Sequence, residues 1–471
     1  MTNKPIKFGT DGWRAVIADQ YTFENLDRVS RATAVWLHKT AGPAPRVVLG
    51  HDTRFLSRAF AEYAARVLAI EGVHVRFAET FTTTPSVSWG TKAFGRDAGV
   101  VITASHNPPE YNGFKIKSSD GGPASPEMIA AVEQEIKLYR EGPPPPSFEA
   151  LLAAGRIETW DLAGDYRRLL AAQLDIEAIR TAGLKVAHDA MYGSGQGIVS
   201  QLLGHENVVE LHCDENPGFA GQPPEPIERN LAELAELVVR EGCAAGLAND
   251  GDADRIGMVD ETGAFVDSHR LLALLTKYLY EERGLRGDIV KTYSTTHLLE
   301  KMAAAYGLIL HTTPIGFKYI GPMIVEGDVL VGGEESGGIA VKGHIPERDG
   351  VYIGLLVLEM MVKRGKPLSA LVQELFDEFG PHAYYRVDQH TTNEKKAALL
   401  KRLKEEGGLR QIGGHAVTEV GTLDGYKHVT AHGWLLVRPS GTEPVLRIYA
   451  EAESPEAAKA LVEDAVRQMN V

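Results

Sequence analysis

A serine in the segment 103–108 of this 471-residue chain has a type and setting that could do chemistry. The segment reads Thr-Ala-Ser-His-Asn-Pro and directly follows the apolar run 100–102. A serine at the end of a buried strand, as Ser105 would be, can act as a nucleophile or carry a phosphoryl group, and His106 is its neighbour. Lys115 could protonate or shield the serine oxygen. A plain turn is the alternative, because these residue types favour turns.

Three aspartates alternate along the segment 249–255, which reads Asn-Asp-Gly-Asp-Ala-Asp-Arg. Asp250, Asp252 and Asp254 offer the hard oxygen ligands that Mg²⁺ and Ca²⁺ prefer. An EF-hand loop is rejected, because Arg255 stands where that loop requires glycine and an apolar strand follows in place of a helix. A phosphatase that uses Asp250 as its nucleophile is an alternative. A solvated acidic turn is disfavoured by the adjacent arginine.

The segment 332–338, Gly-Gly-Glu-Glu-Ser-Gly-Gly, places carboxylates and a hydroxyl on a flexible backbone. Glu334 and Ser336 suit the hydroxyls of a sugar, and the carboxylates would repel a phosphate. A metal role and a solvated turn are the alternatives, because the spacing is unspecific.

A phosphate-binding loop is indicated at 438–444, which reads Arg-Pro-Ser-Gly-Thr-Glu-Pro. Arg438 presents a planar fork of donors to phosphate oxygens. Ser440 and Thr442 add hydroxyl donors, and Gly441 lets backbone N–H groups approach an anion. A hairpin turn alone does not explain the arginine together with both hydroxyls. Combined, the four segments indicate a phosphorylated sugar as the ligand.

The elements that must position these segments alternate between short apolar runs and amphipathic stretches. Strand-type runs are found at 46–50, 99–103, 184–187 and 288–291, and helical spacing at 25–38 and 60–70. The alternation predicts an α/β fold with largely parallel sheets, in which ligands lie at the carboxyl ends of strands. Similar strand-then-turn patterns recur, which is consistent with three related units.

Composition indicates where the domains end. The four prolines at 143–146 form a stiff spacer, and a strand and turn at 258–263 suggest a second boundary. From about Asp388 the pattern changes to a charged helix, short strands and a final helix, which indicates a separate α+β domain. The length itself predicts three to four domains.

The overall composition excludes several classes of protein. Hydrophobic residues at 44% and charged residues at 24% are ordinary for a globular enzyme and exclude a disordered chain. A net charge of -14 argues against nucleic acid as a partner. Cys213 and Cys243 are too few for a disulfide framework or a four-thiolate zinc site. No long apolar run or signal-type segment is present, so we expect a cytoplasmic enzyme without a membrane partner, monomeric or homodimeric.

The motifs TASHNP, DGDADR, GEESGG and RPSGTEP occur in this order, and the chain resembles the α-D-phosphohexomutase superfamily of phosphoglucomutases and phosphomannomutases along its whole length. FGTDGWR at 8–14 is similar to the N-terminal segment of that family, which implies that Arg14 lies near the site. The resemblance implies an α/β fold of four domains around a central cleft. Three similar mixed α/β domains precede a smaller α+β domain, with expected limits at 1–146, 147–258, 259–384 and 385–471.

The resemblance also implies a reaction. Ser105 would be stored as phosphoserine and would pass its phosphoryl group to a hexose monophosphate. The hexose 1,6-bisphosphate so formed, which also acts as activator, would turn around and return its other phosphate. One Mg²⁺ would be held by Asp250, Asp252, Asp254 and a phosphoserine oxygen. Arg255 and the catalytic residue Lys115 would add positive charge at the transferring group. The other residues would bind substrate: Glu334 and Ser336 at sugar hydroxyls, and Arg438, Ser440, Gly441 and Thr442 at the second phosphate.

The general base is left open among several residues. Lys115 and His106 lie beside the serine in sequence. Arg348, in the segment 344–350, takes the place of a basic residue near the sugar in phosphoglucomutases, but an arginine is almost always protonated. Lys318 is a further candidate for the base and is also expected to bind substrate, and a surface lysine is the equal alternative.

The expected substrate preference depends on the residue at position 338, which is Gly338. Phosphoglucosamine mutases and dual-specificity phosphomannomutase/phosphoglucomutases usually carry histidine at this place, so GEESGG is closer to the glucose-preferring branch. We expect glucose phosphates first, and mannose phosphates or dual specificity second. The alternatives of other classes are a Mg-dependent aspartyl-phosphate phosphatase, which would leave Ser105 without a role, and a non-catalytic sugar-phosphate sensor.

Overall fold

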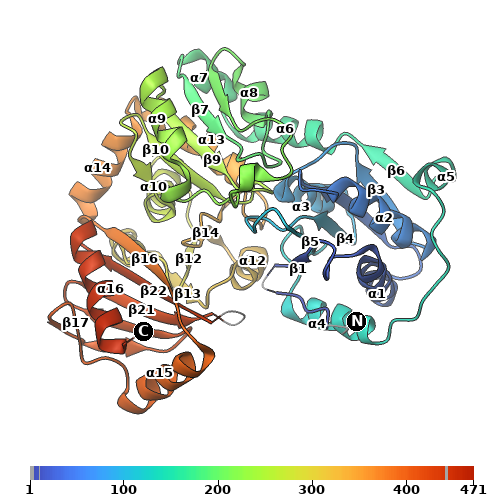
Figure 1. Cartoon of the computed structure of the whole chain (residues 1–471). Coiled ribbons are helices and arrows are strands. Elements are labelled where there is room, and N and C mark those ends of the chain that lie inside the picture. Colours follow the sequence, from blue (N-terminus) through green and yellow to red (C-terminus); the bar gives the residue numbers. More distant parts are fainter. Residues whose placement is uncertain (1–4, 10, 441–443, 471) are drawn as a thin grey trace. The chain divides into compact units, whose positions relative to one another are not determined.

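The computed structural model describes residues 5–9, 11–440 and 444–470 of the chain (Figure 1). Its first sheet has the strand order β1-β5-β4-β2-β3-β6. The strands β2, β3, β4 and β6 are parallel, and β5 pairs antiparallel with both β1 and β4. The strands are β1 (Trp13–Val16), β2 (Arg46–His51), β3 (His74–Ala78), β4 (Ala98–Ile102), β5 (Tyr111–Lys117) and β6 (Ile157–Trp160). The helices of this part are α1 (Phe23–Ala41), α2 (Ser57–Ile70), α3 (Thr84–Ala93), α4 (Pro126–Lys137) and α5 (Phe148–Ala153).

A second mixed sheet has the order β11-β10-β9-β7-β8. Its strands are β7 (Val186–Asp189), β8 (Val208–Leu211), β9 (Ala245–Asn249), β10 (Ile256–Asp260) and β11 (Phe265–Val266). The helices around it are α6 (Leu162–Gln173), α7 (Ile176–Thr181), α8 (Ile198–Leu203) and α9 (Ala232–Glu241), with short 3₁₀ turns η1 (Phe219–Gly221) and η2 (Glu228–Asn230). β9 and β10 are antiparallel, so the aspartate segment is the turn between two buried strands.

The next strands form two pairs. β12 (Asp288–Thr292) and β13 (Leu310–Thr313) are parallel, and β14 (Val329–Gly333) and β15 (Ile339–Val341) are antiparallel. The accompanying helices are α10 (Ser268–Glu281), α11 (Leu298–Tyr306), α12 (Phe317–Glu326), α13 (Gly350–Arg364) and α14 (Leu368–Phe379).

The C-terminal sheet is antiparallel, with the order β16-β22-β21-β20-β19. It comprises β16 (Ala383–His390), β19 (Glu419–Gly421), β20 (Tyr426–Thr430), β21 (Gly433–Pro439) and β22 (Val445–Ala452). A small hairpin, β17 (Gln411–Ile412) and β18 (His415–Ala416), and the helices α15 (Asn393–Glu406) and α16 (Pro455–Met469) complete this part. The predicted α/β class with a smaller α+β part at the C-terminus is confirmed.

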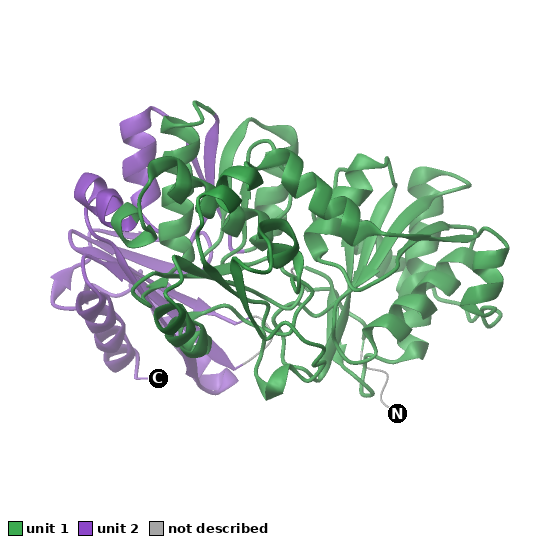
Figure 2. Ribbon diagram, turned by 90° about the horizontal axis from the view of Figure 1, so that it is seen from above, with its two compact units in different colours: residues 1–286, 316–371 green, residues 287–315, 372–471 purple. Residues whose placement is uncertain are grey.

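The chain divides into two compact units, shown in different colours in Figure 2. Unit 1 comprises residues 1–286 and 316–371, and unit 2 comprises 287–315 and 372–471. The four domain limits expected from the sequence divide the chain more finely than these units and stay a prediction. Of the helices in the described ranges, none combines the length and apolar character that a bilayer-spanning segment requires.

The strand β4 shows how the sequence places the serine. All five of its residues, Ala-Gly-Val-Val-Ile, are buried, as expected for a strand covered on both faces. The strand ends at Ile102, and the chain turns through 103–108 before β5 returns antiparallel beside it. Ser105 therefore lies at the carboxyl end of a buried strand, where open α/β sheets hold their ligands.

Candidate functional site

Two segments that are far apart in sequence meet at Ser105, within unit 1. The Ser105 hydroxyl donates a hydrogen bond of 2.7 Å to Asp250 Oδ2, across 145 residues of sequence. Ser105 is 1% exposed and has a φ of 52°, in the left-handed region that non-glycine residues seldom adopt. The backbone of Ser105 is thus strained, and its hydroxyl is held against the Asp250 carboxylate.

Glycine allows this close approach. A Cβ atom added to Gly251 would lie 2.5 Å from the Ser105 carbonyl oxygen, so no other residue fits there without displacing one of the two segments. The Thr84 amide, at the start of α3, also donates to the Asp252 carbonyl at 3.0 Å. The aspartate turn is therefore fixed against the first sheet.

The three aspartates form a group that fits a metal ion. One carboxylate oxygen from each of Asp250, Asp252 and Asp254 lies within 4.8 Å of the others, and all three residues are 0% exposed. The Oδ1 atoms of Asp252 and Asp254 accept no hydrogen bond from any described residue. Burial, and then the charges of Asp254 and Asp252, raise the pKa of Asp250 well above its usual value. Unpaired buried oxygens and mutual repulsion are what a divalent cation would relieve.

Lys115 lies among carboxylates from two segments. Its Nζ is 2.7 Å from Asp252, 3.1 Å from Asp254 and 2.7 Å from Asp11. Burial alone would lower the pKa of Lys115, but these carboxylates outweigh burial and raise it above its usual value. Lys115 is therefore held as a cation, which suits charge neutralisation and argues against a role as general base.

Arg348 bridges the aspartates and the 332–338 segment. Its Nη2 donates to Asp254 and to Asp11 at 2.7 Å, and its Nη1 lies 3.4 Å from Glu334. Burial would lower its pKa, but Asp254 and Glu347 contribute most to a pKa well above the usual value. Arg348 cannot serve as a base in this setting.

His106 is the candidate base whose pKa is shifted toward the neutral form, in contrast to Lys115 and Arg348. Its Nδ1 is 3.3 Å from the Ser105 Oγ. Burial, and then the charges of Arg255, Arg14 and Lys115, lower its pKa well below the usual value. The imidazole is therefore neutral around pH 7, and a neutral imidazole can accept a proton.

The two remaining arginines lie beside the same groups. Arg14, on β1, donates from Nη1 to the Asn107 side chain at 2.9 Å, which places it at the serine segment. Arg255 Nε lies 3.9 Å from Asp254 and 4.0 Å from Asp250.

The 332–338 segment forms the turn between β14 and β15. Burial raises the pKa of Glu334 to about 7, although the charge of Arg348 opposes this. A Cβ atom at Gly338 would lie 2.2 Å from Arg348 Cδ and 3.3 Å from Glu334 Oε2. The arginine thus occupies the space that a side chain at position 338 would need. Ser336 is half-buried in the same turn.

Lys318 is not brought into this group. It lies near the start of α12, with its Nζ 5.2 Å from the centre of the Tyr319 ring. Within the described ranges it forms no ion pair with the residues around Ser105.

The predicted phosphate loop belongs to unit 2. Arg438, near the end of β21, donates from Nε to Asp424 Oδ1 at 3.0 Å. The Ser440 amide donates to the Val445 carbonyl at 2.9 Å, and the Ser440 carbonyl accepts from Lys396 at 3.0 Å. Gly441 and Thr442 lie outside the described residues.

Sequence reasoning missed several charged residues of the site. Asp11 contacts Lys115, Lys117 and Arg348. Burial would raise the pKa of Asp11, but these cations hold it well below its usual value. Glu347, 0% exposed, accepts from Lys117 at 2.6 Å. Asp11 stands inside the FGTDGWR motif and Glu347 inside the segment 344–350, which were the available signals, whereas nothing in the sequence marks Lys117.

Comparison with known proteins identifies relatives along the whole chain. Models of the phosphoglucomutase/phosphomannomutase alpha/beta/alpha domains I, II and III match residues 5–142, 165–263 and 267–379, and the C-terminal domain model matches 389–468. The chain is 32% identical to a phosphoglucomutase/phosphomannomutase of Thermococcus kodakarensis, over 97% of this chain and 96% of that protein. It is 31% identical to a phosphoglucosamine mutase of Geobacillus kaustophilus, covering 98% of each. The crystal structure of a "putative phosphomannomutase" from Thermus thermophilus matches with a TM-score of 0.87 and 35% identity, over 99% of this chain and 100% of that one.

Proposed function

Because this chain belongs to the phosphoglucomutase/phosphomannomutase family, whose enzymes move phosphate within a sugar, we propose that it interconverts hexose 1-phosphate and hexose 6-phosphate, with glucose phosphates preferred. The hydrogen bond from Ser105 to Asp250, inside a ring of carboxylates and cations, is the observation that supports this most strongly. The matches give no support to an aspartyl-phosphate phosphatase, and Asp250 accepts a hydrogen bond from Ser105.

The proposed reaction has two transfers. In the first, the bond between phosphorus and Ser105 Oγ breaks while a bond forms to the free hydroxyl of the hexose monophosphate. The proton of that hydroxyl passes to a base, for which the neutral His106 is our candidate, and the departing Ser105 oxygen takes up a proton to become the hydroxyl that donates to Asp250. The hexose 1,6-bisphosphate then reorients and returns its other phosphoryl group to the serine. Added bisphosphate would phosphorylate an unmodified Ser105, which is why we propose it as activator.

The charged residues around Ser105 would position the reacting groups and neutralise the charge of the phosphoryl group. Mg²⁺, the cation we propose for Asp250, Asp252 and Asp254, would neutralise charge on the transferring phosphoryl group when bound. Lys115 and Arg348 hold the aspartates by ion pairs and stay cationic. Arg14 and Arg255 would add positive charge at the phosphate.

The remaining candidate residues would bind the substrate. Glu334 and Ser336 would bind sugar hydroxyls, and Lys318 stays a further substrate-binding candidate. The phosphate that is not being transferred would be bound by residues of the C-terminal loop, namely Arg438, Ser440, Gly441 and Thr442.

The preference for glucose rests on Gly338. Since Arg348 fills the space at this position, a histidine there would displace the arginine from Glu334 and Asp254. The relatives carry names for glucose, mannose and glucosamine phosphates, so their names do not decide the matter. Glucose and mannose differ in one hydroxyl, and a pocket that does not hydrogen-bond it discriminates poorly.

The test is to measure turnover of glucose 1-phosphate, mannose 1-phosphate and glucosamine 1-phosphate side by side. Each assay contains Mg²⁺ and a trace of the matching bisphosphate, and the Ser105→Ala variant is the control. A preference for glucose of at least about tenfold, lost in the control, is expected. Equal rates would overturn the preference but keep the mutase, and free phosphate released by the Ser105→Ala variant would overturn the mutase.

A further inference from the structure

Arg54, in the sequence Asp-Thr-Arg that follows β2, is a fully buried cation with no role in the reaction described so far. Its guanidinium donates to backbone carbonyls of the serine segment and the turn beyond it. Nη2 lies 2.7 Å from Ser105 O and 2.5 Å from Asn107 O, and Nη1 lies 2.8 Å from Pro108 O and 3.1 Å from Tyr111 O. One side chain thus satisfies four carbonyls around the reacting serine.

Asp52 and Phe219 hold this arginine in place. Asp52 Oδ2 lies 3.3 Å from Arg54 Nε, and Asp52 Oδ1 accepts from the Ser57 hydroxyl at 2.5 Å. The Phe219 ring lies under the guanidinium, with the ring centre 4.8 Å from Arg54 Cζ. The planar group is therefore constrained at its edge by a carboxylate and on a face by an aromatic ring.

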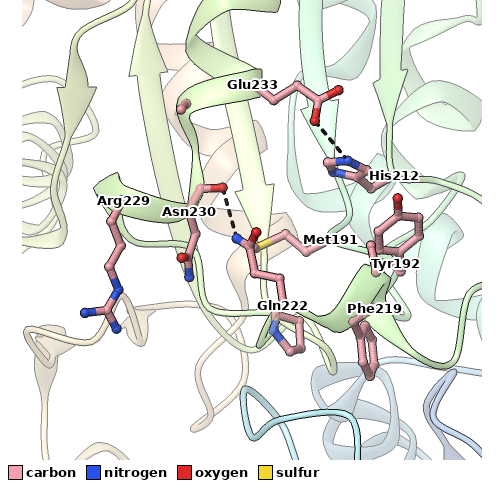
Figure 3. A pocket seen from close by; sticks show the side chains of 11 residues that line it. Met191, Tyr192, His212, Phe219, Gln222, Arg229, Asn230 and Glu233 are labelled. Atoms are coloured by element: carbon pink, nitrogen blue, oxygen red, sulfur yellow. Dashed lines mark hydrogen bonds and ion pairs between the residues drawn. The ribbon is translucent and has the colours of Figure 1, made fainter.

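Phe219 lies in the 3₁₀ turn η1, which belongs to the part of unit 1 around the second sheet. It lines a cavity of about 290 Å³ together with Tyr192 and His212, and Figure 3 shows the ring at the edge of that cavity. Phe219, Tyr192 and His212 all have positive φ, with values of 46°, 59° and 48°. The backbone there is strained, and its strain is tolerated only because the surrounding packing fixes it.

The backbone of Ser105 explains why such an anchor is needed. Its φ of 52° costs conformational energy, and its carbonyl lies between Arg54 and Gly251. Without Arg54, the Ser105 and Asn107 carbonyls would lose the side-chain donor that the structure gives them, and the turn would relax toward a lower-energy conformation. That relaxation would carry the Ser105 hydroxyl away from Asp250.

We propose that Arg54 is a positioning residue of phosphoryl transfer, which holds the segment 103–111 so that Ser105 Oγ stays against Asp250, with Phe219 fixing the plane of its guanidinium. The proposal rests on the proposed function. A displacement of about 1 Å of a reacting group can cost about 10²-fold in rate, so an anchor of this kind affects kcat more than substrate binding.

The test compares Arg54→Lys and Arg54→Ala with Arg31→Ala as a matched control. Arg31 is also a buried arginine that donates to carboxylates and to a carbonyl, that of Pro143, but it lies on α1 away from Ser105. We expect kcat to fall about 10–100-fold in Arg54→Lys, with KM changed by less than about threefold. Added guanidinium should increase the kcat of Arg54→Ala at least about tenfold. The control Arg31→Ala should lose thermal stability but keep its kcat.

A second measurement does not depend on turnover. Amide hydrogen exchange of peptides covering 103–117 should accelerate at least about tenfold in Arg54→Lys, with peptides elsewhere unchanged. Phe219→Leu should give the same local change to a smaller extent. Unchanged exchange in this segment, or a rise in KM at constant kcat, would overturn the positioning role. A wild-type protein that lacks mutase turnover would instead overturn the proposed function and leave the exchange experiment valid.

Discussion

A buried lysine in unit 1 and a buried lysine in unit 2 have their charges compensated differently. In unit 1, Lys115 lies within 3.1 Å of three carboxylates, and Arg348 contacts Asp254, Asp11, Glu334 and Glu347. In unit 2, Lys427 is 4% exposed and lies 4.0 Å from the centre of the Trp434 ring, with its Nζ donating to the Tyr293 carbonyl at 2.9 Å. Among the residues described, no carboxylate lies within ion-pair distance of Lys427.

The difference fits the proposed roles, in which unit 1 carries the reacting serine and the C-terminal loop of unit 2 binds phosphate. Networks of paired charges resist rearrangement, because moving any member leaves a buried charge without a partner. Arg438 of unit 2, by contrast, forms an ion pair with Asp424 and is 21% exposed at its side chain. We therefore expect substitutions in unit 1 to reduce kcat and substitutions in unit 2 to change KM or stability.

The largest effect is expected for Asp252→Asn. This change removes one charge from the metal group and weakens the ion pair with Lys115, so kcat should fall about 10²–10³-fold and the affinity for Mg²⁺ should drop. Steady-state kinetics and calorimetric Mg²⁺ titration measure both. Asp260→Asn is the control, because this buried aspartate supports the turn after β10 through Thr262 and Ala264. A full kcat in Asp252→Asn would refute the metal role.

A smaller loss is expected for Gly338→Ala. The added Cβ would overlap Arg348 Cδ, so the arginine must move away from Asp254 and Glu334. We expect kcat/KM to fall about tenfold and the free energy of unfolding to drop by about 1–3 kcal/mol. Gly218→Ala is the control, because Gly218 has a φ of -89° and only a 3.4 Å contact at its Cβ position. Equal effects in both variants would contradict the packing argument.

Asp424→Asn probes the binding element of unit 2. Its carboxylate accepts from Arg438 and, at 2.9 Å, from the Ile315 amide, and thereby orients the arginine fork. We expect KM for hexose phosphate to rise about 3–10-fold with kcat nearly constant. Asp388→Asn, which breaks the Arg386 pair on β16, should leave KM unchanged. A fall in kcat without a change in KM would break the division between the units.

The smallest effect on activity, close to none, is expected for Lys427→Met. Burial, and then the charge of Lys291, lower the pKa of Lys427 to about 7 from its ordinary 10.5. Between these pH values the unfolded chain binds the proton and the folded protein does not. The free energy of unfolding should therefore rise with pH across this window, by up to about 2 kcal/mol, and the rise should vanish in the variant. Denaturant unfolding at pH 7 and pH 9 measures this, with Lys459→Met, an exposed lysine, as control. If the free energy of unfolding still rises with pH in Lys427→Met, the pH dependence belongs to another group.

The sequence by itself was enough to single out the motifs that could carry chemistry. Ser105 after a buried strand, alternating aspartates, and Arg438 beside hydroxyls are local patterns, because each depends on residues within a few positions of one another. The alternation of strand and helix patterns was enough for the α/β class, and the motifs in order were enough for the family.

Only the tertiary structure decided which charges meet. Ser105 and Asp250 are 145 residues apart, and Asp11 meets Arg348 across 337 residues. The carbonyls that Arg54 binds and the space that Arg348 fills beside Gly338 are set by packing between separate elements. The pKa directions that keep Lys115 a cation and His106 neutral follow from these contacts. The physical reason is that electrostatic energy and burial depend on distances in space, which spacing along the chain does not specify.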